Sequence, residues 1–211
     1  MAFINENEVL WDEVSPGIGL DIQGDSKLIV SWVNGRWRCT NRQYQKRVDK
    51  IVGTLCRLGD CMNIRPSSLG SNLVRHQFRE ANGRADSLTH LAREGRHYQT
   101  YVADYEPLYQ YERDAYQSFC IRSAFDGGVS CKGCGCGYWI DIGFRLRPEF
   151  CTDVSPHLRP VIFKTVRECC WLIPDDSTVT ETELYACEAL VEGVSDICDK
   201  YFNEYFQPMH F

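Results

Sequence analysis

The sequence predicts a mixed α/β fold, with one central mixed sheet and helices on both sides of it. Short apolar segments of alternating polarity, typical of strands, are interspersed with segments whose apolar residues recur every three or four positions, typical of helices. Hydrophobic residues make up 44% of the 211 residues, so the chain can bury a core of ordinary size. We therefore expect both halves of the chain to contribute to one sheet.

The first half of the chain contains two strand patterns and three helix patterns. In the first helix Asp25 can act as the N-cap, and Gly35 follows the last apolar position. Glycine, proline and serine gather at residues 59–71, which we expect to form a loop. The expected elements are a strand at 17–24, a helix at 25–34, a helix at about 41–58, a strand at 73–78 and a helix at 82–96.

The second half begins with a connector, residues 97–118, which is rich in tyrosine and acids and carries no clear strand pattern. We expect this connector to be partly helical after Pro107. A short apolar strand then delivers Asp126, and the two glycines after it favour a chain reversal. The remaining expected elements are a second strand through 138–142, a loop at 143–160, a strand at 161–173 and a long helix at 181–206.

Composition limits the classes of function. A net charge of −6 argues against a protein that coats nucleic acid by bulk positive charge, although a local basic face remains compatible with it. The acidic start of the chain is unlike a signal peptide, and no stretch is apolar enough to cross a membrane. We therefore expect an intracellular protein, cytoplasmic or nuclear, whose 12 cysteines are mostly free thiols.

Four acidic residues carry the functional hypothesis, and each has a structural alternative. Asp25 can cap a helix, and Asp86 falls in a first helical turn, where the helix dipole favours an acid. Asp126 can open an Asp-Gly hairpin turn, and Glu183 completes a capping box with Thr180. Taken singly, none of the four indicates an active site.

The segments around these acids resemble the type 1 ribonuclease H family. The family's last strand–helix unit resembles NGRADSLTHLA with its preceding histidine, and its strand–turn–helix resembles GDSKLIVSWVNG. Its first strand pair resembles AFDGGVS followed by CGYWIDI, and the start of its first long helix resembles STVTETELYACEALVEG. The resemblance implies a ribonuclease H-like fold and the catalytic residues Asp126, Glu183, Asp25, Asp86 and His76.

The order of these segments is a cyclic rotation of the family's order. Residues 17–97 resemble the family's C-terminal half, residues 119–206 resemble its N-terminal half, and residues 98–118 would connect them. We therefore expect residues 1–211 to form a single, circularly permuted domain, which is sterically feasible where the ends lie at the surface. The alternatives are a chain that spans parts of two tandem copies, or two chains that exchange halves as a domain-swapped dimer instead of a monomer.

Four converging carboxylates would repel one another without cations, and hard oxygen ligands suit two Mg²⁺ or Mn²⁺ ions. The resemblance implies that Asp126 bridges both ions, that Glu183 and Asp25 hold one, and that Asp86 holds the other. It also implies hydrolysis of the RNA strand of an RNA–DNA hybrid, with His76 assisting proton transfer or product release. The alternatives are a non-catalytic nucleic-acid-binding or interaction module and a chance match in an unrelated acidic protein.

A basic, aromatic stretch beginning at Arg36 is the candidate phosphate-binding surface, and its alternative is a solvated helix face. Its residues are Arg36, Trp37, Arg38, Arg42, Tyr44, Lys46, Arg47 and Lys50, and the family motif adds Asn82 as a substrate contact. Cys131, Cys134 and Cys136 form a C-x-x-C-x-C motif. This motif leaves two interpretations open, a zinc site or free thiols in a glycine-rich turn, because a structural zinc usually has four ligands from two pairs.

Overall fold

A computed structural model describes residues 18–62, 73–101, 116–146, 162–174 and 176–201. Within these residues, strands and helices alternate in the first half and a three-stranded meander opens the second half. The elements are β1 (Ile18–Gly24), α1 (Lys27–Val33), α2 (Arg42–Met62), β2 (Arg75–His76), the 3₁₀ turn η2 (Arg79–Ala81), α3 (Gly83–Arg93), β3 (Tyr98–Tyr101), β4 (Tyr116–Ser130), β5 (Gly133–Leu146), β6 (Ile162–Ile173) and α4 (Val179–Tyr201).

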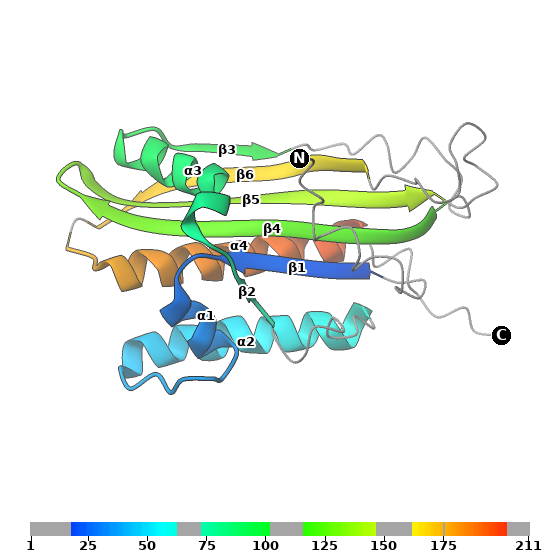
Figure 1. Cartoon of the computed structure of the whole chain (residues 1–211), viewed down its shortest axis with the longest axis horizontal. Helices are drawn as coiled ribbons and strands as arrows, with labels where there is room; N and C mark the ends of the chain where they lie inside the picture. Colours follow the sequence, from blue (N-terminus) through cyan, green and yellow to red (C-terminus); the bar gives the residue numbers. More distant parts are fainter. Residues whose placement is uncertain (1–17, 63–72, 102–115, 147–161, 175, 202–211) are drawn as a thin grey trace, which may run out of the picture.

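The strands form one six-stranded mixed sheet in the order β2-β1-β4-β5-β6-β3 (Figure 1). β1 runs parallel to β2 and to β4, whereas β4, β5, β6 and β3 pair antiparallel. The prediction of a mixed α/β fold with one sheet drawn from both halves is confirmed. The strand that carries Asp126 lies inside the sheet beside the strand that precedes Asp25.

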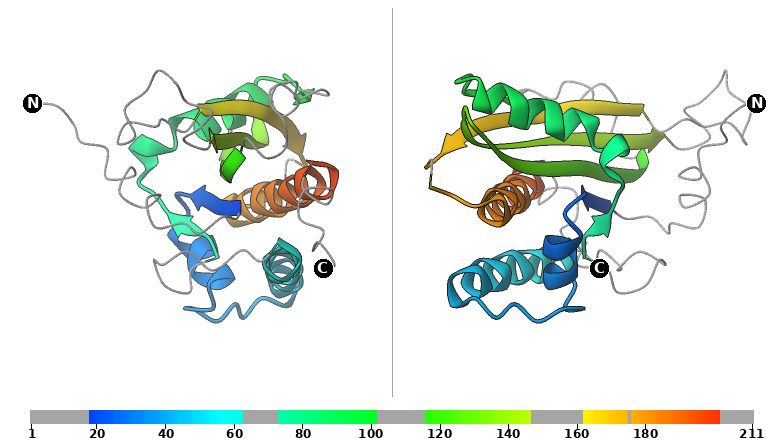
Figure 2. Two further views of the ribbon diagram at one scale, coloured as in Figure 1. Left: turned by 90° about the vertical axis from the view of Figure 1, so that its right-hand side faces the viewer. Right: turned by 60° about the vertical axis from the view of Figure 1, so that its left-hand side comes forward.

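Helices cover both faces of this sheet, because side chains of neighbouring strand residues point to opposite faces and both sets include apolar residues. On one face α4 packs over β4 and β5, and α2 packs against α4 (Figure 2). The core of that face includes Phe125, Ile140 and Leu190, each at most 1% exposed. On the other face α3 covers a smaller cluster that includes Leu88, Ala124 and Trp139.

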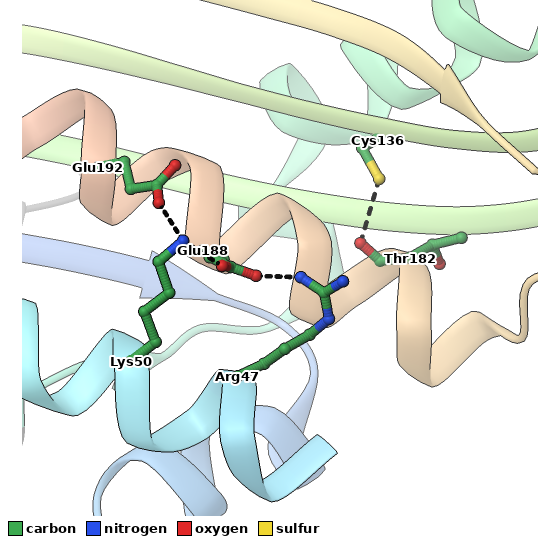
Figure 3. Close-up of polar contacts among 6 residues, drawn as sticks. All are labelled: Arg47, Lys50, Cys136, Thr182, Glu188 and Glu192. Atoms are coloured by element: carbon green, nitrogen blue, oxygen red, sulfur yellow. Dashed lines mark hydrogen bonds and ion pairs between the residues drawn. The ribbon is translucent and has the colours of Figure 1, made fainter. Parts of the chain in front are cut away.

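Ion pairs fasten α2 to α4. Glu188 of α4 accepts hydrogen bonds from Arg47 and from Lys50 of α2, and Lys50 also lies 2.5 Å from Glu192 (Figure 3). The Arg47 guanidinium stacks on the Tyr185 ring at 3.7 Å from its centroid. The prediction that Arg47 and Lys50 belong to a phosphate-binding surface is therefore corrected, since both cations bind acids of α4.

Several boundaries differ from the predicted ones. The predicted connector contains β3, which pairs with residues 167–170 of β6 and was missed because this non-local pairing, rather than local pattern, stabilises it. β4 already begins at Tyr116, so the connector is shorter than predicted, and the helix expected after Pro107 falls in residues 102–115, outside the described part.

Other elements end at different residues. β4 does not stop at Asp126 but runs four residues further to Ser130. The predicted strand at 73–78 is reduced to β2, two residues long, and α2 continues past 58 to Met62. β5 extends to Leu146, into the segment expected to be a loop. No helix in the described residues is both long and apolar enough to cross a membrane.

Candidate metal centre

Strand register brings Asp25 and Asp126 together. β1 and β4 run parallel, with Gly24 opposite Phe125. Asp25 and Asp126 directly follow these two residues along the chain and therefore lie side by side. Asp25 does not cap α1: the N-cap is Ser26, and no side chain makes a cap hydrogen bond there. Asp126 does not open a turn either, because β4 continues through it opposite Gly137 of β5. The structural alternatives for both acids are therefore excluded.

The N-terminal part of α4 brings Glu183 to the same place. Its capping box is formed by Thr178 and Glu181: the Glu181 carboxylate accepts from the Thr178 N–H at 2.7 Å, and the Glu181 N–H donates to the Thr178 hydroxyl at 3.2 Å. The predicted box of Thr180 and Glu183 is thus wrong by two residues. This shift leaves Glu183 free of capping and directs it toward β4.

Gly127 permits the close approach of α4 to β4. A Cβ at this position would overlap the carbonyl carbon of Thr182 and the backbone nitrogen of Glu183. The Gly127 N–H in turn donates a hydrogen bond to the Glu183 carboxylate. The sequence predicts that the two glycines after Asp126 permit a chain reversal. Neither glycine has a positive φ, so it is the absence of a side chain, and not an unusual backbone, that the structure requires there.

Together the three acids form a compact ligand set. One carboxylate oxygen each from Asp25, Asp126 and Glu183 lie within 4.8 Å of one another. Asp126 and Glu183 are only 5% and 7% exposed. Within the described residues, Asp25 Oδ1 and Glu183 Oε2 are buried and have no hydrogen-bond partner. Buried carboxylate oxygens are strongly stabilised by a cation, so the set fits a divalent ion with hard oxygen ligands.

Burial and mutual repulsion favour protonation of this set when no ion is bound. Burial first, and then the charges of Asp126 and Asp25, raise the pKa of Glu183 to about 9. Burial and the Asp25 charge raise the pKa of Asp126 to about 6. Burial is the larger cause of both shifts and repulsion between the acids the second, and Glu183 is more affected than Asp126. A site that resists ionisation by itself gains most from a cation.

Asp86 lies near this set without joining its ligand group. It occupies the first turn of α3, and its charge contributes to the raised pKa of Asp126, after burial and Asp25. Its side chain is 35% exposed and forms an ion pair with Arg79 at 3.7 Å. The prediction that four carboxylates form one cluster is thus correct for three, with Asp86 at the edge.

His76 and Asn82 both lie beside the centre. The His76 Nε2 atom is 3.1 Å from the backbone oxygen of Asp25, and this histidine of β2 is exposed. Asn82 is 1% exposed, donates to the Phe125 carbonyl at 3.0 Å and accepts from Gln77 at 2.6 Å. Its predicted role as a substrate contact needs correction, because its amide is used in holding β4 next to Asp126.

The basic surface lies at the start of α2 and the turn before it. Arg36, Trp37, Arg38, Arg42 and Lys46 are all exposed, as a phosphate-binding surface requires. Arg38 and Arg42 line an open cavity of about 430 Å³. The surface adjoins the first turn of α4, because the Tyr44 hydroxyl lies 3.2 Å from that of Thr178. It therefore neighbours the start of the helix that supplies Glu183.

The cysteines have structural roles. Cys134 is buried and donates to the backbone oxygen of Ser177 at 3.3 Å. Cys136 is buried and donates to the backbone oxygen of Thr182 at 3.2 Å (Figure 3). Cys131 is exposed, and no group of cysteines suited to a metal occurs in the part of the chain that is described. All ten cysteines described there are free thiols, as predicted, so the zinc alternative finds no support.

Two contributors to the centre were missed in the sequence. Thr89 of α3 donates its hydroxyl to the Asp126 carbonyl at 3.0 Å, and Arg79 places its guanidinium next to Asp86. Arg79 could have been recognised as a cation close to the Asn-x-x-x-Asp segment, three residues before Asn82. Thr89 carries no signal in a single sequence, because only the packing of α3 on β4 gives it a partner.

In comparisons with known proteins, no family model and no curated protein matches this chain. Its function is therefore argued from the centre's own geometry.

The close contact at Gly127 gives a stability prediction. Gly127→Ala is expected to lower the free energy of unfolding by about 1–3 kcal/mol, because the added methyl overlaps the α4 backbone, which cannot move like a side chain. Gly53→Ala in α2 is the matched control, since a Cβ there meets nothing within 4 Å and alanine is the better helix former. Chemical denaturation measures the free energy of unfolding of both variants. A Gly127→Ala protein as stable as its parent would contradict the close contact.

Proposed function

We propose that this protein is a metal-dependent endoribonuclease that hydrolyses the RNA strand of RNA–DNA hybrids, on a circularly permuted ribonuclease H-like fold. The single observation that carries the proposal is the grouping of Asp25, Asp126 and Glu183 within 4.8 Å, with two buried oxygens lacking partners. None of these three acids caps a helix or opens a turn, which were the structural alternatives for them. A buried acid cluster with no structural role is costly unless it binds a cation.

The arrangement of the sheet is compatible with the permutation. β1, from the first segment, pairs parallel with β4 from the second, as strands of the two family halves would. The first residues of β1 and the last turn of α4 lie at the same end of the molecule (Figure 1). In the proposed permutation a connection between these two points has been lost, and the segment from 98 to 118 links the halves instead.

The residues of the centre divide the work as follows. Asp25, Asp126 and Glu183 would hold one Mg²⁺ or Mn²⁺ ion, and Asp126 with Asp86 would hold a second. When bound, such ions neutralise charge on a phosphodiester and assist the attack of water on it. Asp126, in the interior of the sheet, keeps its position through the β4 ladder and Thr89. His76, beside Asp25, is placed to accept or return a proton at its exposed ring.

The basic surface would hold the nucleic acid. The exposed cations before and within the first turns of α2, with Trp37, would bind phosphates of one strand next to α4. Such a surface compensates locally for the net charge of −6. Proteins that read hybrids recognise groove shape and the 2′-hydroxyl rather than base sequence, so no sequence preference is expected.

A cleavage assay tests the proposal. A short hybrid labelled on its RNA strand should be cut in Mg²⁺ or Mn²⁺ and remain intact in EDTA, whereas the same hybrid labelled on its DNA strand should remain intact in both. Single-stranded and double-stranded RNA serve as further controls. Equal cutting with and without metal would overturn the mechanism. Binding of the hybrid without any cutting would instead favour the non-catalytic module.

A further inference from the structure

Phe78, at the rim of the metal centre, is 77% exposed, more than the other exposed large hydrophobic residues of the described chain, Trp37, Val129 and Val179. Single exposed apolar residues are common on protein surfaces and need no explanation by themselves. Phe78 differs because the segment that carries it is fastened to the residues that supply the metal ligands.

The residues on either side of Phe78 are anchored to the ends of β1 and β4. The Gln77 N–H donates to the Gly24 carbonyl at 3.0 Å, one residue before Asp25. The Gln77 amide also donates to Asn82, which in turn donates to the Phe125 carbonyl, one residue before Asp126. The position of Phe78 relative to the centre is therefore set by hydrogen bonds, as it would have to be for a substrate contact.

Among the described residues, the Phe78 ring packs against one other ring, that of His76. It lies edge-to-face with the His76 ring, with centroids 6.1 Å apart and planes at 78°. His76 is itself fixed to the Asp25 backbone oxygen at 3.1 Å. The high exposure of Phe78 means that most of the ring surface remains available to a planar ligand.

Arg79 adds a positive charge next to this ring. Its side chain is 79% exposed, and its guanidinium contacts Asp86 at 3.7 Å. An exposed aromatic ring followed by an exposed arginine provides what a nucleotide needs: a flat apolar face for the base and a cation for the phosphate. Neither residue is itself one of the proposed metal ligands.

We propose that Phe78 stacks on an unpaired base of the bound strand and that Arg79 binds the adjacent phosphate. The inference rests on the proposed function, since it takes the strand at the metal centre to be nucleic acid. A base inside a continuous duplex is already stacked on both faces, so Phe78 gains a partner only where a base is unpaired. The preferred substrate is therefore a hybrid with a single-stranded extension or junction beside the cleaved bond.

Binding measurements on Asp126→Asn protein separate recognition from cleavage. Fluorescence anisotropy would compare a blunt RNA–DNA hybrid with the same hybrid carrying a single-stranded RNA extension. Phe78→Ala should weaken binding of the extended hybrid at least about fivefold, the lower end for loss of one stacked base, and leave the blunt hybrid unchanged. Phe78→Trp should retain the preference, and Val129→Ala, which removes another exposed apolar side chain, should change neither affinity.

The outcomes distinguish the two proposals. Equal affinity of Phe78→Ala and its parent for the extended hybrid would overturn the stacking role while leaving metal-dependent cleavage intact. Equal weakening for both hybrids would overturn the preference for an unpaired base. A parent protein that neither binds nor cuts a hybrid would overturn the proposed function and this inference with it.

Discussion

Asp126→Asn is expected to reduce metal-dependent cleavage of a hybrid about a thousandfold or more while the protein stays folded. Asp126 is the ligand predicted to be shared, and loss of several kcal/mol of charge stabilisation, at 1.36 kcal/mol per factor of ten, gives about this magnitude. Initial rates at saturating Mg²⁺ measure the effect. Asp21→Asn is the matched control, because Asp21 lies on the neighbouring strand β1 and pairs with Arg75 instead of joining the centre.

The same variant should be more stable than its parent when no metal is present. Burial, followed by repulsion from Asp25, raises the pKa of Asp126 from 3.8 to about 6, so at pH 8 the folded protein must hold a charge that burial disfavours. Replacing it by a neutral amide removes a penalty of up to about 3 kcal/mol. Denaturation in EDTA tests this gain. Cleavage at the parental rate by Asp126→Asn would refute the centre, whatever its stability.

The stability of the metal-free protein is expected to fall as pH rises from about 4.5 to about 9, and divalent ions should oppose this fall. The pKa of Glu183 is raised from 4.5 to about 9 in the folded state, so the folded protein holds a proton that the unfolded chain releases. The folded state therefore binds one more proton than the unfolded chain within that window, and low pH stabilises it. The free energy of unfolding falls by about 1.4 kcal/mol for each pH unit that the pH rises through the window.

Metal binding should offset this dependence, because a ligand carboxylate must lose its proton before it binds the ion. A fixed Mn²⁺ concentration about 100 times the dissociation constant at pH 8 would stabilise the fold by about 2.7 kcal/mol at that pH, and by less at pH 6, where proton competition raises the dissociation constant. Thermal unfolding with Mn²⁺ or EDTA at both pH values measures it.

Glu183→Gln and Glu181→Gln form a matched pair for this experiment. Glu183→Gln should flatten the pH dependence and abolish stabilisation by Mn²⁺, because it removes the titrating ligand. Glu181→Gln removes a charge from the capping box but keeps an oxygen that can accept from the Thr178 N–H, and it should retain both responses. If the two variants respond alike to metal, Glu183 is not a ligand.

Local sequence pattern was sufficient to predict the elements that are long and periodic, and to select the candidate acids. The helix α4 and the strands around Asp126 were predicted because their apolar residues repeat over many positions. The pairing of Asp25 with Asp126 was predicted from resemblance alone, since no local signal shows that Gly24 and Phe125 share a register.

Features that depend on distant partners were not predictable from local sequence. The strand β3 exists because β6 supplies its hydrogen bonds, and the choice of Thr178 over Thr180 as capping residue depends on where α4 meets β4. Lys50 appears in the sequence as one more cation of a basic run, and only the packing of α2 on α4 pairs it with Glu188. Each of these errors arose where tertiary contacts override local preference.

The arrangement of the sheet also sets the order in which the chain can fold. Ile18 of β1 pairs with Phe119 of β4, and the two edge strands β2 and β3 likewise belong to the first half. During synthesis from the N-terminus, β1 has no β4 to join until the ribosome has released residues 116–130, about a hundred residues later. Contacts so distant in sequence slow folding, and strands that wait for partners are prone to aggregate. The metal centre, with ligands from both halves, is accordingly among the last parts of the molecule to form.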